Sequence, residues 1–286
     1  MLYGVIDIGS NSVRLMMHDG VKTLYKKIKI TALAENMGEQ RVLTTEAIKR
    51  TALAVAEFVS FAKKQCADEI FAFATAAVRY AKNRAIFLDE VKNLCGVDVE
   101  VVSGDTEAEL GYIGALNGSD GGVIDIGGAS AEVIVCKNGK KIFGKSLDVG
   151  AVKIKDKCGQ DYNAVKAFLL DKITEYGNIP NAEFCGIGGT ATTIASVLLK
   201  LEVYDAEKVN GFCVERTQLD SLVQKLFSMT VEERKKLKGL QPERAEVIAG
   251  GAELMLLIMN KIGIDKITVS ESDNLEGYLM KKMEKQ

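Results

Sequence analysis

The chain has 286 residues, of which 47% are hydrophobic and 27% are charged, and its formal net charge is −2. This length suffices for two domains of ordinary size or one large one, and the composition is that of a globular protein. A net charge so close to zero provides no overall basic field, so we expect no nucleic-acid partner.

Cysteine usage and hydropathy indicate an aqueous, reducing compartment. The six cysteines are scattered without a CxxC pair, and no signal peptide is recognisable, so we expect a cytoplasmic protein with buried thiols. No apolar run is long enough to cross a bilayer, so no membrane partner is expected. The single histidine, His18, excludes a multi-histidine metal site and fits a strand better than a catalytic role.

The first half of the chain is predicted to be an α/β unit. Short apolar runs favour a meander of three strands, and a Thr-capped segment with helical spacing favours a long helix. The predicted elements are strands at 2–8, 12–18 and 21–30, a helix at 44–66, a strand at 69–75, helical stretches at 76–94, a strand near 97–102 and a helix from about 105 to 116.

The segment Asn117-Gly-Ser-Asp-Gly-Gly122 is the strongest linker signal in the chain. It predicts an N-terminal lobe at 1–117 and a C-terminal lobe at 122–286, joined by a linker at about 117–122. Because the second lobe repeats the order of the first, we expect two similar α/β lobes. Its predicted elements are strands at 122–127, 131–137 and 140–148, a helix, a strand at 183–187, helices at 190–201 and 243–262, a strand at 266–270 and a terminal helix.

An internal repeat is the most informative feature of the sequence. Residues 5–15 read VIDIGSNSVRL and residues 123–133 read VIDIGGASAEV, with six matches over eleven positions. Each copy is an apolar strand that ends in Asp, followed by a turn of small residues and a second apolar run. We therefore expect one fold used twice, with the equivalent turns facing each other across a cleft.

The two turns have the composition of phosphate-binding loops. Glycine lets the backbone approach a phosphate closely, and the exposed N–H groups of such turns form anion-binding nests. The hydroxyl and amide side chains can donate further hydrogen bonds. The candidate phosphate ligands are Ser10, Asn11, Ser12 and Ser130, with the backbone amides of Gly127, Gly128 and Ala129.

The aspartates of the repeat predict a metal ion. Asp7 and Asp125 would repel a phosphate by about 4 kcal/mol at 4 Å and an effective dielectric of 20. A divalent cation between them reverses that sign, and Mg²⁺ prefers one or two carboxylates with phosphate and water. Glu132 stands two residues after Ser130 and could reach the same ion. The alternative is that each Asp only caps a tight turn.

A third glycine segment, Cys185-Gly-Ile-Gly-Gly-Thr190, follows an apolar strand and opens a helix. Amides at the start of that helix could bind another phosphate or a nucleoside, which makes Gly188, Gly189 and Thr190 candidate ligands. Glycines also allow close packing of strand and helix, and the sequence does not decide between the two explanations.

In this order the segments resemble the exopolyphosphatase and guanosine pentaphosphate phosphohydrolase (Ppx/GppA) family of the actin-like ATPase superfamily. The resemblance covers nearly the whole chain and implies two ribonuclease H-like lobes with an interlobe cleft. Its motifs are DIGSNSVRL at 7–15, ATAAVRYAKN at 74–83, VSGDTEAELGYIG at 102–114, DIGGASAE at 125–132, SLDVGAVKI at 146–154, GIGGTATTIA at 186–195 and GLQPERAEVIAGGAELM at 239–255.

The resemblance implies an exophosphatase that removes terminal phosphate from inorganic polyphosphate or converts guanosine pentaphosphate to tetraphosphate. It assigns the catalytic base to Glu107 and a substrate-phosphate contact to Arg79. Mg²⁺, or another divalent cation, is assigned to Asp125 and Glu132, and the first-loop aspartate falls on Asp7.

The residues themselves leave simpler roles open. A Glu in the first turn of a helix often only complements the helix dipole, and Glu109 could complete a capping box with Thr106. Chemically, Glu107 would orient and deprotonate a water in line with the scissile bond. Arg79 and Arg14 would stabilise the transferred phosphoryl group, or else form surface salt bridges.

Three departures from the family pattern predict reduced activity or an altered substrate. Ala129 and Ala131 replace Gly and Thr, which removes a hydroxyl donor. Thr106 replaces an acidic residue, and Glu109 stands where Arg is common. Segment 270–277, SESDNLEG, lacks the Arg of the usual SDxGLREG.

The chain is also a short form without the helical, HD-like C-terminal domain of longer members, so poor processivity on long polymer is expected. A homodimer is expected only by analogy with relatives.

Two other functions stay open at this stage. Because the motifs are eroded at 106, 129 and 131, a non-catalytic sensor of guanosine penta- or tetraphosphate is an alternative. An actin-like ATPase or small-molecule kinase shares the two phosphate loops, although the ATAAVR and SG-x-x-E-A segments argue against it. The sequence does not fix substrate preference, physiological metal or oligomeric state.

Overall fold

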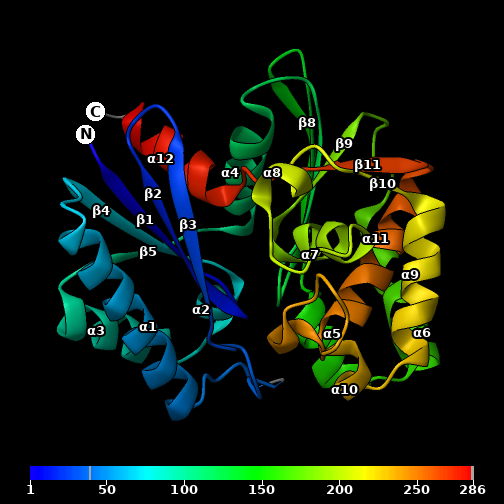
Figure 1. The fold of residues 1–286 in the computed structure, drawn as a ribbon, viewed down its shortest axis with the longest axis horizontal. Coiled ribbons are helices and arrows are strands. Elements are labelled where there is room, and N and C mark those ends of the chain that lie inside the picture. Colours follow the sequence, from blue (N-terminus) through cyan, green and yellow to red (C-terminus); the bar gives the residue numbers. More distant parts are fainter. Residues whose placement is uncertain (39, 285–286) are drawn as a thin grey trace. The chain divides into compact units, whose positions relative to one another are not determined.

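The computed structural model describes residues 1–38 and 40–284, and the chain divides into two compact units (Figure 1). The first unit is Met1–Glu107 with Tyr278–Gln286, and the second is Ala108–Gly277. The chain passes between units inside two helices, α4 (Gly104–Leu116) and α12 (Asn274–Met283). The division lies inside α4, which ends just before the glycine-rich segment at 117–122. Lobes at 1–117 and 122–286 stay a prediction.

The first unit is built on a five-stranded sheet with the strand order β3-β2-β1-β4-β5. Strands β1 to β3 form the predicted antiparallel meander, and β4 and β5 run parallel to β1. The strands are β1 (Tyr3–Ile8), β2 (Ser12–His18), β3 (Thr23–Ile30), β4 (Glu69–Ala74) and β5 (Val99–Val101).

Helices cover both faces of this sheet. Helix α1 begins after Thr44, whose side chain accepts a hydrogen bond from the Ala47 amide, and it packs against α3 on one face (Figure 1). On the other face Tyr278 of α12 stacks on Phe73, with ring centroids 4.5 Å apart. The helices of this unit are α1 (Thr45–Lys64), α2 (Ala76–Tyr80) and α3 (Arg84–Cys95).

The second unit is built on a six-stranded sheet with the order β10-β11-β9-β6-β7-β8. It repeats the design of the first, since β6 to β8 form an antiparallel meander and β9 runs parallel to β6. The strands are β6 (Gly121–Ile126), β7 (Ala131–Lys137), β8 (Lys140–Leu147), β9 (Phe184–Ile187), β10 (Cys213–Glu215) and β11 (Lys266–Val269).

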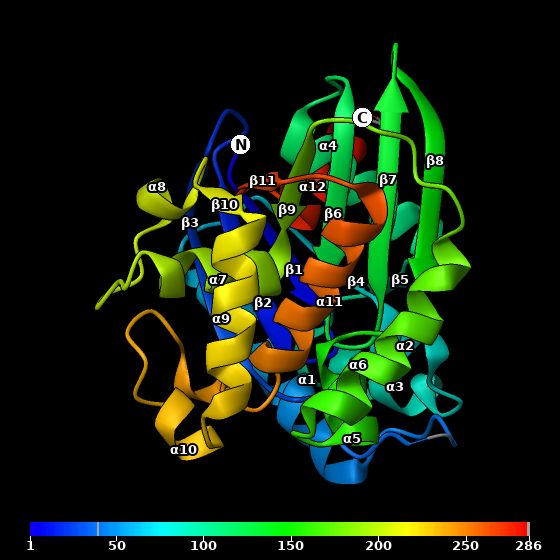
Figure 2. The same ribbon diagram turned by 90° about the vertical axis from the view of Figure 1, so that its right-hand side faces the viewer.

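The main core of the second unit lies where α11 packs on the sheet and on α9 (Figure 2). Helix α11 is buried along almost its whole length, because its sequence IAGGAELMLLIMNKI is apolar on every side. The helices are α5 (Ala151–Cys158), α6 (Tyr162–Lys172), η1 (Ile173–Tyr176), α7 (Gly188–Leu198), α8 (Ala206–Val209), α9 (Arg216–Ser228), α10 (Val231–Arg234), η2 (Pro242–Arg244) and α11 (Ile248–Ile262).

The strand registers confirm the internal repeat. Asp7 pairs with Arg14 across β1 and β2, and Asp125 pairs with Glu132 at the same position across β6 and β7. The turns that follow are closed by the same hydrogen bond, from the amide of the first glycine to the carbonyl three residues later. Its length is 2.9 Å in both copies.

Most predicted elements are confirmed, with four differences. The single helix predicted between the strands at 140–148 and 183–187 is three helical segments, α5, α6 and η1. The helical stretch at 76–94 is two helices, and the helix predicted at 243–262 begins at Ile248. The stretch 202–242, which the sequence left unassigned, holds α8, β10, α9 and α10. Strand β10 has three residues, too few to show an alternating pattern.

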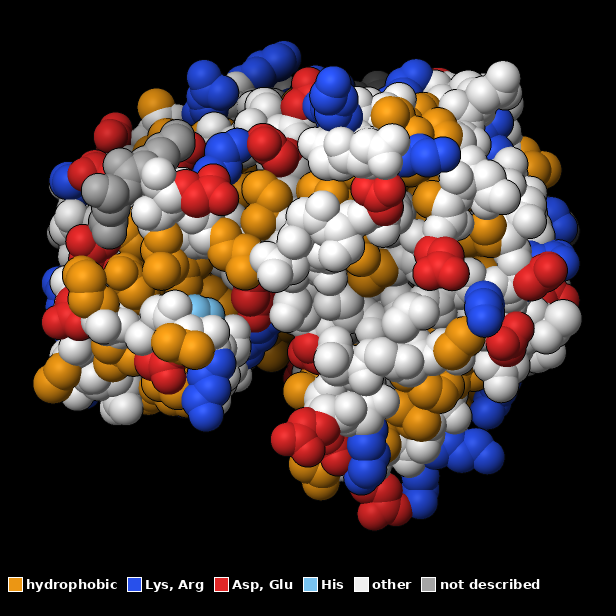
Figure 3. Space-filling view, turned by 90° about the horizontal axis from the view of Figure 1, so that it is seen from above, with side chains coloured by type: hydrophobic (Ala, Val, Ile, Leu, Met, Phe, Trp, Pro, Cys, Tyr) orange, Lys and Arg blue, Asp and Glu red, His pale blue; other side chains and the backbone are white. Residues whose placement is uncertain are grey.

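Each sheet has one long and one short edge. The long edges are β3 and β8, both rich in lysine, and the short edges β5 and β10 have three residues each. Elsewhere, basic and acidic side chains are interspersed on the face shown in Figure 3. Within residues 1–38 and 40–284, no helix has both the length and the hydropathy of a membrane span.

Helices α4 and α12 approach so closely that only glycine fits between them. A Cβ atom on Gly114 would lie 1.9 Å from the carbonyl oxygen of Asp273, and one on Gly277 would lie 1.9 Å from that of Leu110. Both obstacles are backbone atoms, which cannot move aside alone. The contact therefore fixes how the first turn of α12 meets α4.

We expect Gly277→Ala to destabilise the protein by about 1–3 kcal/mol or more, because overpacking here must displace a helix backbone. Gly144→Ala is the matched control, since a Cβ there meets only the flexible chain of Lys141. Thermal and urea unfolding of both variants provide the test. Equal stability of the two variants would show that the close helix crossing is absent.

Candidate functional site

The turn after β1 is held by backbone hydrogen bonds from the segment that follows β3. The amides of Thr31 and Ala32 donate to the Asn11 carbonyl at 3.0 and 2.9 Å, and the Ala34 amide donates to the Ser10 carbonyl at 2.9 Å. The carbonyls of the turn are thus occupied. Its amides and side chains, rather than its carbonyls, are left to meet a ligand.

The turn after β6 is held in the same way by the start of α5. The Ala151 amide donates to the Gly127 carbonyl at 2.9 Å, and the Val152 amide donates to the Gly128 carbonyl at 2.8 Å. Close packing requires Gly150, whose Cβ would lie 2.6 Å from the amide nitrogen of Ala129.

These contacts show which of the predicted phosphate ligands already take part in hydrogen bonds of the turns. The Gly127 amide donates to the Ser130 carbonyl and so closes the turn. In the described part of the chain no backbone acceptor is found for the amides of Gly128 and Ala129, which are the better anion donors. The side chains of Ser10 and Ser130 are buried in their turns, and those of Asn11 and Ser12 are half-buried.

The residue opposite each aspartate differs between the copies. In the first unit Arg14 donates to one oxygen of Asp7, with Nε at 3.0 Å and Nη2 at 2.5 Å. This ion pair balances the charge of Asp7, so the structure gives Asp7 a cationic partner of its own. Roles for Asp7 on a metal and for Arg14 on phosphate stay predictions.

Glu107 and Arg79, both in the first unit, form a buried ion pair. Arg79 follows β4 in the short helix α2, and its Nη1 donates to Oε2 of Glu107 at 2.7 Å and to the Val102 carbonyl at 2.9 Å. Glu107 lies in the first turn of α4 with only 6% of its surface exposed. The predicted base and the predicted phosphate contact are therefore neighbours.

Burial raises the pKa of Glu107 to about 7, with the nearby Asp7 adding to the rise and Arg79 and Arg14 opposing it. A carboxyl group with a pKa near neutrality can take a proton from water and later release it, as a general base must. The pKa and position of Glu107 thus suit the role that the sequence assigns to it.

The capping-box explanation for the first turn of α4 does not hold. The helix is capped by Ser103, whose hydroxyl accepts a hydrogen bond from the Thr106 amide at 3.0 Å. Thr106 is therefore not the capping residue, and Glu109 lies exposed instead of closing a capping box with it. Arg79 is likewise not a surface salt bridge, because its side chain is only 13% exposed.

The second unit brings two buried carboxylates together. Asp125 and Glu132 face each other across β6 and β7 and are 9% and 2% exposed. Glu132 Oε1 accepts a hydrogen bond from the Ser146 hydroxyl at 2.6 Å. Asp125 Oδ2 accepts a hydrogen bond from the side-chain amide of Asn274 at 3.0 Å.

These residues fit a divalent cation. Adjacent buried carboxylates repel each other, and a cation between them reverses that cost. Among residues 1–38 and 40–284 no cluster of three or more His, Cys, Asp and Glu forms a metal site. Mg²⁺ needs no such cluster, because it commonly uses one or two carboxylates with waters and substrate phosphates.

The third glycine segment lies beside Asp125. A Cβ on Gly188, where φ is +74°, would lie 2.5 Å from Oδ1 of Asp125, so this glycine permits the close approach. The Thr190 hydroxyl donates to the Ile126 carbonyl at 2.7 Å and thereby ties α7 to the end of β6. Packing thus accounts for Gly188 and Thr190; their roles as phosphate ligands stay predictions.

Arg244 is a candidate ligand that the sequence analysis did not single out. Its guanidinium lies directly over Gly189, where a Cβ would be 2.3 Å from Nη1. The GLQPERAEV segment gave a signal, because it matches the family pattern and contains this arginine. The sequence alone does not show that Arg244 lies beside Gly189, because the two residues are far apart in the chain.

One departure from the family pattern carries less weight than the sequence suggested. Ala131 is fully buried in the main core of the second unit, and its carbonyl accepts a hydrogen bond from the Tyr176 hydroxyl at 2.8 Å. Ala131 stands where the family has Thr, and its side chain lies in the core. The lost hydroxyl is therefore not one of the donors of the turn.

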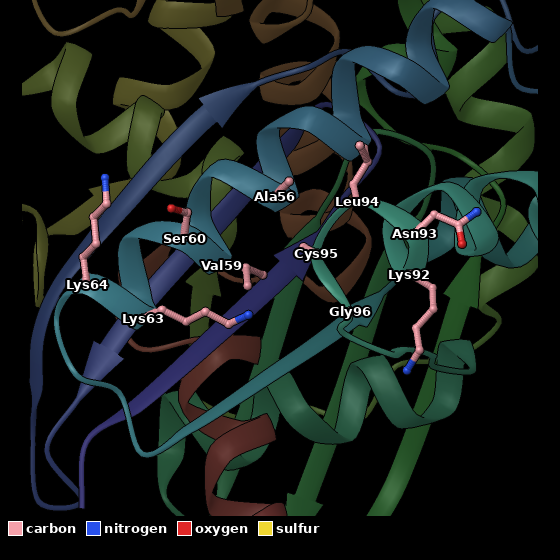
Figure 4. A pocket seen from close by; sticks show the side chains of 10 residues that line it. All are labelled: Ala56, Val59, Ser60, Lys63, Lys64, Lys92, Asn93, Leu94, Cys95 and Gly96. Carbon is pink, nitrogen blue, oxygen red and sulfur yellow. The ribbon is translucent and has the colours of Figure 1, made fainter.

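A separate groove of about 680 Å³ lies between the C-terminal ends of α1 and α3 (Figure 4). Lys63, Lys64 and Lys92 line it, and each stands in the last turn of its helix. Lysines at helix C-termini complement the helix dipole. The groove lies at the end of the sheet opposite to the turn after β1.

Two α/β units, each with an Asp–Gly turn at the end of its central strand, define the actin-like ATPase fold. An exopolyphosphatase-like protein of known structure shares this fold, with a TM-score of 0.93, 24% identity and coverage of 100% of this chain and 99% of that one. The model of the Ppx/GppA phosphatase family matches residues 12–286. The chain therefore belongs to the Ppx/GppA phosphatase family.

Three curated relatives match nearly all of the chain. The bifunctional 3-dehydroquinate synthase/phosphatase of Fusobacterium nucleatum is 31% identical over 98% of this chain and 46% of its own length. Exopolyphosphatase 2 of Mycobacterium tuberculosis is 28% identical over 96% of both proteins. The guanosine-5'-triphosphate,3'-diphosphate pyrophosphatase of Vibrio atlanticus is 28% identical over 96% of this chain and 58% of its own length.

The chain thus spans about half the length of the Fusobacterium relative and nearly all of the mycobacterial one. Among solved structures, the Ppx/GppA family member of Aquifex aeolicus has a TM-score of 0.81 and is 28% identical, with coverage of 100% of this chain and 98% of that one.

The raised pKa of Glu107 predicts a pH-dependent stability. Between the ordinary pKa of 4.5 and the folded value of about 7, the folded protein binds more protons than the unfolded chain. Its stability therefore falls as pH rises through this window. Glu107→Gln lacks this titration. The melting temperature of the variant minus that of wild type should therefore increase by several degrees from pH 5 to pH 8.

Calorimetry at both pH values provides the measurement, with Glu109→Gln, an exposed substitution on the same helix, as the control. A melting-temperature difference that stays constant between pH 5 and pH 8 would contradict the raised pKa of Glu107.

Proposed function

We propose that the chain is a divalent-metal-dependent phosphohydrolase that releases terminal phosphate from a linear phosphoanhydride. The observation that carries this proposal is the buried Glu107, whose pKa is raised to about 7 beside Arg79. The substrate class comes from relatives named exopolyphosphatase and guanosine-5'-triphosphate,3'-diphosphate pyrophosphatase.

In the first unit, Glu107 accepts a proton from the attacking water. The water oxygen bonds to the terminal phosphorus, and the anhydride P–O bond breaks, with the electron pair leaving on the shortened chain. Arg79 orients Glu107 through the 2.7 Å contact and provides positive charge beside the reacting phosphoryl group. Amides and hydroxyls of the turn after β1 bind phosphate oxygens.

In the second unit, Asp125 and Glu132 would hold the cation, which would supply positive charge to neutralise the phosphate oxygens. The amides of Gly128 and Ala129 donate to phosphate, and Arg244 adds a cation next to the third glycine segment. The cleft that the sequence predicts between the two halves stays a prediction.

The proposal predicts that Glu107→Gln lowers the rate of phosphate release about 10²–10⁴-fold, because general-base catalysis contributes a factor of that size. Release is measured with Mg²⁺ on polyphosphate, guanosine pentaphosphate and ATP, side by side. Glu109→Gln is the control and should retain wild-type activity. A Glu107→Gln enzyme as fast as wild type would end the proposed mechanism.

The same panel separates the alternatives. Tight binding of guanosine pentaphosphate without turnover in Mg²⁺ would identify a sensor, and ATP hydrolysis faster than release from the other substrates would identify an ATPase.

A second prediction concerns pH. Because Glu107 is active only as the carboxylate, kcat/KM should fall about tenfold per pH unit below pH 7. The pH profile of polyphosphate hydrolysis between pH 5 and pH 9, at constant ionic strength and saturating Mg²⁺, checks this. A profile that stays flat down to pH 5 would assign the proton transfer to another group.

A further inference from the structure

Asn274, the first residue of α12, contacts a predicted metal ligand. Its Nδ2 donates to Oδ2 of Asp125 at 3.0 Å, and only 3% of Asn274 is exposed. The two residues are 149 positions apart in the sequence. No motif of the resemblance assigns a role to Asn274.

Two hydrogen bonds between side chains and backbone amides hold the start of α12 in place. The Leu275 amide donates to Oδ1 of Asp273 at 3.0 Å, and the Asp273 amide donates to Oε2 of Glu276 at 3.0 Å. The glycine contacts of α12 with α4 hold the same turn from outside. The backbone of Asn274 is thus fixed on both sides.

The side-chain amide of Asn274 has one workable orientation. Its Oδ1 lies against Gly111, where a Cβ would be only 2.8 Å away, and within the described chain no group donates to it. A reversed amide would turn Oδ1 toward the Asp125 carboxylate, and two acceptors would then repel. A buried acceptor without a donor costs about 1–3 kcal/mol. The orientation that lets Asn274 donate to Asp125 therefore destabilises the fold at Oδ1.

We propose that Asn274 is a positioning residue that fixes the carboxylate plane of Asp125 for a divalent cation. The inference rests on the proposed function, which places that cation on Asp125 and Glu132. A neutral amide suits this task because it orients the carboxylate without cancelling the charge that attracts the metal. Arg14, by contrast, brings a full positive charge to Asp7 in the first unit.

The required precision comes from the metal. Mg²⁺ demands nearly octahedral ligands at about 2.0–2.1 Å, so a freely rotating carboxylate binds it poorly. Hydrogen-bond partners that orient metal ligands typically contribute 10–100-fold to metal affinity.

The test measures metal binding without any substrate. Mn²⁺ alone is titrated into wild type, Asn274→Leu and Asn274→Ala, and affinity is read by calorimetry and by the electron paramagnetic resonance of free Mn²⁺. Leucine keeps the branching and the number of heavy atoms of asparagine and removes the donor, and alanine avoids any steric conflict. Asn93→Leu, at an exposed position on α3, is the matched control. Melting temperatures in EDTA report on folding.

The Kd for Mn²⁺ should rise 10–100-fold in both variants of Asn274 and stay unchanged in Asn93→Leu. Melting temperatures in EDTA should stay close to that of wild type, because each variant loses the undonated Oδ1 together with the donor to the buried Asp125. A folded variant whose Kd lies within twofold of wild type would overturn the inference, and so would a wild-type protein that binds no Mn²⁺. Wild type that binds Mn²⁺ yet releases no phosphate would instead refute the proposed function alone.

Discussion

One cross-strand position sets the net charge at the end of each central strand. Opposite the aspartate that ends the central strand stands Arg14 in the first unit and Glu132 in the second. The first pair is balanced in charge, whereas the second concentrates two negative charges in a buried place. The repeated backbone thus carries a neutralised aspartate in one unit and a buried pair of carboxylates, the proposed cation site, in the other.

The turns themselves depend on a constraint of the backbone. In both units the segment after the third strand donates its amides to the carbonyls of the turn. The carbonyls would otherwise present negative partial charge to a phosphate. Because these carbonyls are hydrogen-bonded, the groups left at the end of the sheet are donors. The two units achieve this with different sequences, at 31–34 and at 151–153.

The sequence predicts the parts of this arrangement that are local. The repeat predicts the position of both aspartates, and short apolar runs and a threonine cap predict the meanders and α1. The partners of the site residues were harder to predict, because Arg79 meets Glu107 and Asn274 meets Asp125 across long separations in the chain. The 202–242 stretch was missed although α9 has helical apolar spacing at Leu219, Leu222, Val223 and Leu226.

The lysines of the two long edge strands have a consequence for handling the protein. An exposed edge offers unpaired backbone groups to any extended chain, and charged side chains there discourage such pairing. Strand β3 carries Lys26, Lys27 and Lys29, and β8 carries Lys140, Lys141 and Lys145. Chemical acylation of lysine would remove this protection at both edges together. Labelling with amine-reactive dyes therefore invites aggregation, and thiol chemistry at the exposed Cys66 is the safer route.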